Sequence, residues 1–118
     1  MIKVSVFYRN EPGARFDFDY YTTKHLPLVR DKLGTALTGI AADKGIAGGA
    51  PGSAPTYVAI AHLYFESVES FQAAFNPVAE AILGDIPNYT DLQPDLQISE
   101  VAVNASRSEK GEMRIHGH

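Results

Sequence analysis

The sequence contains no cysteine and no tryptophan. Without cysteine, the chain forms no disulfide bond, offers no thiol nucleophile and cannot hold zinc or an iron–sulfur cluster through thiolates. No apolar stretch approaches the roughly 20 residues of a membrane-spanning helix. The first residues, MIKVSVFYRNE, lack the long apolar run of a signal peptide. These absences predict a cytoplasmic protein that does not contact a membrane.

Basic residues are outnumbered: 10 Lys and Arg stand against 14 Asp and Glu, which gives a net charge of −4. A protein that binds the phosphates of a nucleic acid needs a basic face. RNA-binding domains with a four-stranded sheet place exposed aromatic residues in a basic strand. Residues 56–65, the clearest strand of this chain, contain no Lys or Arg. We therefore exclude nucleic acid as a partner.

What the sequence does contain is periodic hydrophobicity within 118 residues, which is enough for one domain with an ordinary core. Residues 1–8 alternate as in a strand with one buried face. Residues 36–47 predict a weaker strand, and residues 96–103 predict the last one. Residues 56–65 are apolar on both faces, which indicates a strand that is buried on both sides.

Two helical regions alternate with these strands. The first begins at Asp17, whose carboxylate can accept from free N–H groups of the first turn, and it ends at Gly34. Pro27 lacks an N–H group, so we expect a kink or two short helices there. The second region begins at Ser67 and restarts at Asn76, which precedes a proline. Each region is therefore expected to be irregular at a proline.

The order strand, helix, strand, strand, helix pair, strand is that of a split βαβ, ferredoxin-like α+β domain with a four-stranded antiparallel sheet. We place this domain at residues 1–104 and expect the polar, aperiodic residues 105–118 to be disordered. With helices on one face only, the other face of the sheet needs a cover. A second copy of the chain is the simplest cover, which predicts a homodimer built as a dimeric α/β barrel.

Residues 18–29 have the sequence FDYYTTKHLPLV, and residues 86–91 have the sequence IPNYTD, which precedes a strand. Both segments resemble the EthD family of the dimeric α/β-barrel superfamily, and the resemblance covers residues 2–103. It implies the same fold and a homodimer. EthD itself is named for an association with ether degradation by a cytochrome P450 system.

The resemblance implies a range of reactions rather than one. Relatives in the superfamily isomerise muconolactones, decarboxylate or dehydrate aromatic polyketides, or oxidise quinol-like substrates without metal or flavin. Some of the lactone-isomerising relatives involve cysteine, which this chain lacks. The implied chemistry therefore has to rest on other side chains.

His25 is the candidate catalytic residue. It lies between Tyr21 and Val29 on the apolar arc of its helix, so its ring is expected to point at the sheet. An imidazole there can act as a general acid or base, because its unperturbed pKa lies near neutrality. The alternative is a core histidine that is hydrogen-bonded to backbone, and the carbonyl left free by Pro27 can orient the ring.

We expect an apolar ligand pocket between the helices and the sheet of each subunit. Its candidate lining residues are Phe18, Tyr21, His62, Phe71, Phe75, Tyr89 and Asp91. Asp91 can accept a hydrogen bond from His25 or close a turn within its own loop. His62 belongs to the pocket if its face of the strand meets the helices, and to the subunit interface if it does not. No tight ligand spacing predicts a metal site, and we expect no cofactor.

Two functions fit these features. The first is a cofactor-independent enzyme in which His25 transfers a proton on a small apolar, cyclic or aromatic compound, as in isomerisation, decarboxylation or dehydration. The second is a non-catalytic binder or carrier of a small hydrophobic ligand that supports an oxygenase in a degradation pathway. A second polar group within reach of a ligand near His25 favours the enzyme. A His25 that is fully satisfied by backbone favours the carrier.

Overall fold

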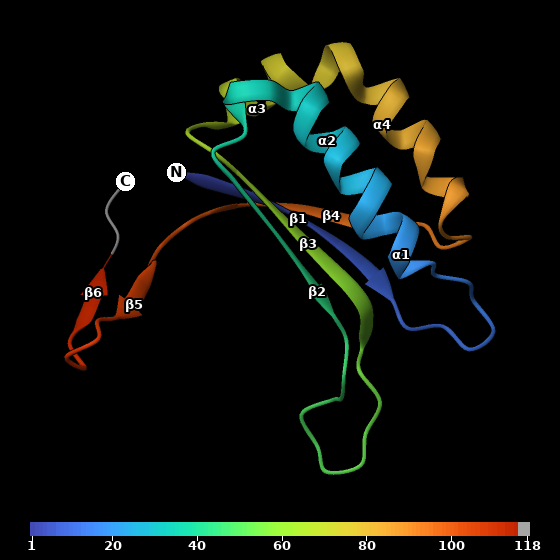
Figure 1. The fold of residues 1–118 in the computed structure, drawn as a ribbon, viewed down its shortest axis with the longest axis horizontal. Helices are drawn as coiled ribbons and strands as arrows, with labels where there is room; N and C mark the ends of the chain where they lie inside the picture. The colour runs from blue at the N-terminus through green and yellow to red at the C-terminus, as the bar shows by residue number, and fades with distance from the viewer. Residues whose placement is uncertain (116–118) are drawn as a thin grey trace.

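The computed structural model of the protein describes residues 1–115, and a four-stranded antiparallel sheet lies at its centre (Figure 1). The strands lie in the order β2-β3-β1-β4. Their bounds are β1 (Ile2–Arg9), β2 (Gly39–Lys44), β3 (Tyr57–Phe65) and β4 (Asp95–Glu100). This topology confirms the ferredoxin-like α+β fold expected from the order of elements.

All helices of the domain cover one face of the sheet (Figure 1). Between β1 and β2 lie α1 (Phe18–Tyr20), the π-helical turn η1 (Tyr21–His25), α2 (Leu26–Leu33) and the 3₁₀ turn η2 (Gly34–Ala36). Between β3 and β4 lie α3 (Val68–Phe75), η3 (Asn76–Val78), α4 (Ala79–Asp85) and η4 (Ile86–Asn88). Within residues 1–115, no helix has the length and apolar character needed to cross a bilayer.

The register of the sheet aligns its apolar side chains on the face that meets the helices. Val4 of β1 pairs with Leu63 of β3 and with Ile98 of β4. One cluster of the buried core on this face consists of Ile2, Val4, Val29, Leu33, Leu63, Phe65, Phe71 and Ile82. Burial of each large side chain of this kind stabilises the fold by about 1.5–3 kcal/mol.

The first helical region begins and ends where the sequence predicts. The carboxylate of Asp17 accepts from the backbone N–H of Tyr20 at 3.1 Å. The rings of Phe16 and Tyr21 lie 5.0 Å apart across this cap, as in a hydrophobic staple. At the other end, Gly34 has a φ of 62°, a backbone conformation that favours glycine.

Pro27 does not divide this region into separate helices. The chain instead forms the π-helical turn η1, in which the backbone N–H of Leu26 donates to the carbonyl of Tyr21, five residues earlier. The hydroxyls of Thr22 and Thr23 donate back to carbonyls of α1, which bends helices. The wider turn therefore absorbs the irregularity that the proline imposes.

The sheet face opposite the helices is partly apolar. Phe7 of β1 and Tyr57 of β3 lie on it with ring centroids 5.1 Å apart, and Ile60 and Tyr64 are half-buried beside them. No helix of the described chain covers this face (Figure 1).

Part of the tail that we expected to be disordered is structured. Residues 105–115 contain a β-hairpin of β5 (Ala105–Arg107) and β6 (Met113–Ile115), which forms a two-stranded sheet of its own. The hairpin stands apart from the four-stranded sheet (Figure 1). The sequence did not predict this hairpin, because a short exposed hairpin buries neither face and so shows no alternation of apolar and polar residues. Residues 116–118, also within the expected disorder, lie outside the described residues.

The core predicts a clear contrast between two substitutions in the sheet. Phe65→Ala removes a side chain with 0% exposure and should lower the free energy of unfolding by about 3–5 kcal/mol. Ile98→Ala changes a side chain that is 47% exposed and should cost about 0.5 kcal/mol or less. Urea titration of both variants measures the two changes, and equal destabilisation would contradict this description of the core.

Candidate active site

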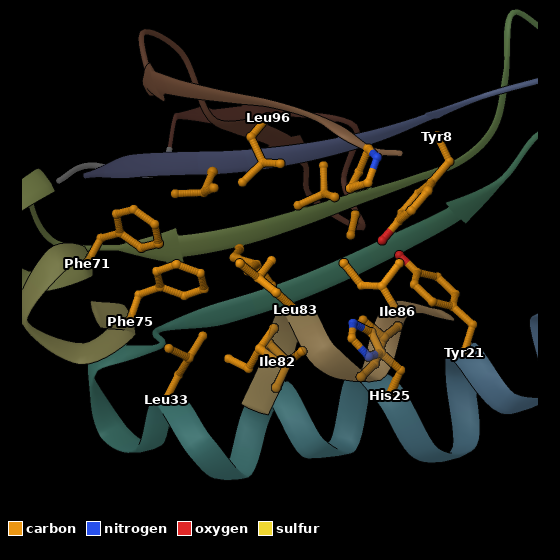
Figure 2. Close-up of a pocket in the computed structure, with 17 residues that line it drawn as sticks. Tyr8, Tyr21, His25, Leu33, Phe71, Phe75, Ile82, Leu83, Ile86 and Leu96 are labelled. Atoms are coloured by element: carbon orange, nitrogen blue, oxygen red, sulfur yellow. The ribbon is translucent and has the colours of Figure 1, made fainter. Parts of the chain in front are cut away.

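A largely apolar pocket lies between the helices and the sheet, and 17 residues line it (Figure 2). Its volume is about 50 Å³. Tyr8, Tyr21 and His25 supply the only polar side-chain atoms of the lining. These three side chains gather at one end, while Phe71 and Phe75 lie at the other (Figure 2). The pocket therefore has a polar end and an apolar end.

The π-helical turn η1 brings two of the three polar groups to the pocket. Tyr21 begins this turn and His25 ends it, and both side chains are buried. Their rings are stacked, with centroids 6.0 Å apart and an interplanar angle of 14°. The third group, Tyr8, lies near the end of β1 on the face that meets the helices.

Asp85 holds the ring of His25. The Nδ1 atom of His25 lies 2.9 Å from a carboxylate oxygen of Asp85, at the end of α4. A carboxylate only accepts hydrogen bonds, so Nδ1 carries the proton and Nε2 carries a lone pair. Within residues 1–115, no hydrogen bond engages Nε2. His25 is 4% exposed and lines the pocket, so an oriented, unused base lies at its polar end.

Two further side chains fix Asp85. The hydroxyl of Tyr20 donates to it at 2.7 Å, and the amide of Asn88 donates at 2.9 Å. The carbonyl left free by Pro27 and the carboxylate of Asp91 were the partners that the sequence offered for His25, and in the structure Asp85 takes this place. Asp85 follows Ile82 by three residues and so faces the core side of α4. A charged residue on that side was the signal that could have revealed it.

The surroundings shift the pKa values of His25 and Asp85 so that the first is a neutral base and the second an ionised acceptor at neutral pH. Burial lowers the pKa of His25 below its usual value, although the neighbouring Asp85 carboxylate acts in the opposite direction. Burial disfavours the ionised form of Asp85, but hydrogen bonds from Tyr20, Asn88 and His25 outweigh it and lower the pKa of that carboxyl. His25 is therefore neutral and Asp85 ionised at pH 7.

Three phenol groups lie beside this pair. The hydroxyls of Tyr8 and Tyr89 share a hydrogen bond of 2.6 Å. The hydroxyl of Tyr21 is buried and has no hydrogen-bond partner among the described residues. In Figure 2 the hydroxyls of Tyr8 and Tyr21 point toward one another at the pocket's polar end. Burial raises the pKa values of all three phenols, which keeps them protonated.

The structure brings some of the predicted site residues together. Tyr21, His25, Phe71 and Phe75 line the pocket. Tyr89 does not line it, but its ring packs against that of His25, with centroids 4.6 Å apart. Tyr8 also lines the pocket, although it was not among the candidate lining residues. Its position at the end of the buried face of a strand was the signal that could have revealed it.

The other predicted residues lie elsewhere. Phe18 is outside this pocket, with the ammonium group of Lys44 4.9 Å from its ring. His62 lies on the open face of the sheet, where its Nδ1 is 3.0 Å from the hydroxyl of Ser5. Asp91 is exposed and accepts from the backbone N–H of Arg15. These residues do not reach His25.

Tyr20 was not among the candidate site residues, yet its half-buried side chain is part of the Asp85 network. Within residues 1–115, no three His, Asp or Glu side chains gather as a group that can hold a metal ion.

Comparison with known proteins agrees with the fold and shows the family. The sequence model of the EthD domain matches residues 14–93, which include η1, α4 and the His25–Asp85 pair. The chain belongs to the EthD family. No curated protein matches it.

Two solved structures of EthD-like proteins resemble the chain. An EthD-like protein from Ralstonia eutropha JMP134 is 48% identical, with a TM-score of 0.85 over 89% of this chain and 95% of that one. An EthD family protein from Bacillus halodurans C-125 is 24% identical, with a TM-score of 0.66 over 85% of this chain and 97% of that one. The second likeness is one of fold.

The His25–Asp85 contact predicts a change that can be measured by NMR. In Asp85→Asn the carboxylate that raises the pKa of His25 is lost, so this pKa should fall further below its usual value. Titration of the His25 Cε1–H resonance measures the change. Asp91→Asn is the matched control, because Asp91 bonds to Arg15 instead. A rise in the pKa of His25, or the same change in both variants, would contradict the pairing.

Proposed function

We propose that this EthD-family protein is a cofactor-independent enzyme that transfers a proton on a small apolar, cyclic or aromatic compound. The observation that carries the proposal is His25, which lines the polar end of an apolar pocket while Asp85 engages its Nδ1 and leaves its Nε2 without a hydrogen bond among the described residues. A base with an oriented ring and a fixed tautomer is the arrangement that general base catalysis requires.

The environment of His25 suits this role. Because its pKa is lowered, the imidazole is unprotonated at neutral pH and can accept a proton from a bound ligand. The imidazolium that forms then donates to Asp85, so the new positive charge is compensated at 2.9 Å. Return of the proton to another carbon completes an isomerisation, and its transfer to a hydroxyl that leaves as water completes a dehydration. Where the proton comes from a carboxyl group that leaves as CO2, its transfer to the carbon that held this group completes a decarboxylation.

The pocket must widen to hold a ring. A cavity of about 150 Å³ accommodates benzene, whereas this pocket measures about 50 Å³. Leu83 of α4 and Leu96 of β4 line it and are 48% and 52% exposed. Because half of each side chain faces solvent, rotation outward costs little packing. We therefore place the entry of the ligand between α4 and β4.

A second function is favoured by the composition of the lining. With 14 of its 17 residues apolar, the pocket also suits a binder that holds a small hydrophobic molecule without transforming it. Such a carrier would present its ligand to an oxygenase of a degradation pathway. In that case His25 and Asp85 would serve to hold η1 against α4.

An assay with 5-nitrobenzisoxazole, a probe of general base catalysis, distinguishes the enzyme from the carrier. Removal of its ring C–H proton breaks the N–O bond and gives a coloured phenolate, so turnover is read by absorbance. We expect turnover to fall about 10²- to 10⁴-fold in His25→Ala. The rate should rise with pH through the lowered pKa of His25 and level above it, since the unprotonated ring is the base.

The assay is run on the native chain and on Leu83→Ala, which opens the wall of the pocket. His25→Ala is made in both backgrounds, and Asp91→Asn serves as a control on the surface. Binding of the probe without His25-dependent turnover in either background would reject the enzyme and support the carrier.

We also propose that the protein is a homodimer whose sheets pack face to face, with the helices outside. The support is the open sheet face, where Phe7 packs against Tyr57 and where Ile60 and Tyr64 are also half-buried. His62 lies on the same face, where its Nδ1 contacts Ser5 and its Nε2 is 3.5 Å from Asp43. A second copy would bury this surface and close the two sheets into a barrel.

Sedimentation equilibrium tests the dimer. The native chain should sediment with twice its monomer mass of 12.8 kDa. Ile60→Glu places a charge on the open face and should give monomers, because burial of an unpaired carboxylate in an interface is costly. Leu83→Glu, on the helical layer, should remain dimeric. A native monomer at micromolar concentration would overturn the proposal.

A further inference from the structure

The three buried phenols in and beside the polar end of the pocket do not all find hydrogen-bond partners. Tyr8, Tyr21 and Tyr89 carry three hydroxyl protons, and one hydrogen bond, between Tyr8 and Tyr89, uses one of them. The hydroxyl of Tyr21 is buried, with its side chain 1% exposed, and no described residue pairs with it. A buried hydroxyl without a partner costs about 1–3 kcal/mol. Such a cost at a pocket wall indicates a ligand atom that pairs with it.

The charge of the lining residues limits the chemical class of the ligand. The pocket contains no Lys or Arg. A substrate with a permanent carboxylate or phosphate would therefore bring a buried, uncompensated charge. The hydroxyls instead fit an oxygen that is neutral when it binds and gains negative charge only during the reaction.

From this geometry we infer that the substrate is a small carbonyl compound, a cyclic ketone, enone or lactone, whose oxygen accepts from the Tyr21 hydroxyl while His25 removes a proton from the adjacent carbon. Tyr8 lines the same end of the pocket and supplies a second phenol beside Tyr21. The inference rests on the proposed proton transfer and adds the class of substrate and the residue that recognises it.

The reaction balances without a co-reactant. The C–H bond breaks, its proton passes to Nε2 of His25, and its electron pair forms a C=C bond. The π electrons of the carbonyl move to the oxygen, which becomes an enolate oxygen held by the Tyr21 hydroxyl. The imidazolium donates to Asp85 and faces the enolate as its counter-charge. Return of the proton to a different carbon yields the isomer and restores neutral His25.

Phenols imitate the enolate, because the phenolate oxygen is also a conjugated anion. The probe is 4-nitrophenol, whose absorbance distinguishes phenol from phenolate, and 4-nitrotoluene is the matched ligand without the hydroxyl. Both are titrated into the native chain and into Leu83→Ala. We expect 4-nitrophenol to bind more tightly than 4-nitrotoluene and its absorbance to shift toward that of the phenolate.

Tyr21→Phe is the deciding variant, since it keeps the ring and removes only the hydroxyl. Its affinity for 4-nitrophenol should fall about 10-fold or more, because hydrogen bonds to charged groups are among the strongest, while its affinity for 4-nitrotoluene stays unchanged. Tyr57→Phe, on the open face of the sheet, should bind both ligands as the native chain does.

Three results would overturn the inference: no preference for 4-nitrophenol over 4-nitrotoluene, unchanged selectivity in Tyr21→Phe, or an equal loss of both ligands in that variant. The outcome is separate from that of the proposed proton transfer. If Tyr21→Phe keeps its selectivity while His25→Ala loses turnover of 5-nitrobenzisoxazole, the general base stands and the carbonyl assignment fails. If Tyr21→Phe loses its selectivity for 4-nitrophenol while turnover of 5-nitrobenzisoxazole does not depend on His25, the oxygen site stands and the proposed enzyme is rejected.

Discussion

The contact between His25 and Asp85 joins two helical segments that lie 60 residues apart in the chain. It fixes η1 against the end of α4, so that the pocket wall formed by both is held in one position. It also fixes the tautomer of His25, because a carboxylate at Nδ1 leaves the lone pair on Nε2. The network about Asp85 and the proposed use of the pocket both depend on this pair.

A polar pair in an apolar layer has to be fully hydrogen-bonded to be stable, since half-satisfied buried groups are costly. Asp85 meets this condition through Tyr20, Asn88 and His25. The nearby hydroxyl of Tyr21, in contrast, is buried and has no hydrogen-bond partner within the described chain. The contrast separates groups that stabilise the fold from groups that are available to a ligand.

The sequence predicted the fold well because the fold depends on local signals. Alternation in residues 1–8, the cap at Asp17 and the stop at Gly34 each act over a few residues, and each is where it was expected. The hairpin of residues 105–115 escaped prediction because it has little apolar surface to pattern. The replacement of a kink at Pro27 by a π-helical turn depended on threonine hydroxyls and on packing.

For the site, the sequence by itself determined that His25 and Tyr21 share the buried face of a helix, and that thiol chemistry is not available. Only the tertiary structure decided that Asp85 is the partner of His25, that Tyr8 joins Tyr21, and that His62 lies on the opposite face of the sheet. Helical periodicity fixes which residues of one element share a face. Contacts between elements depend on strand register and on the angle at which helices cross the sheet, which no local pattern in the sequence specifies.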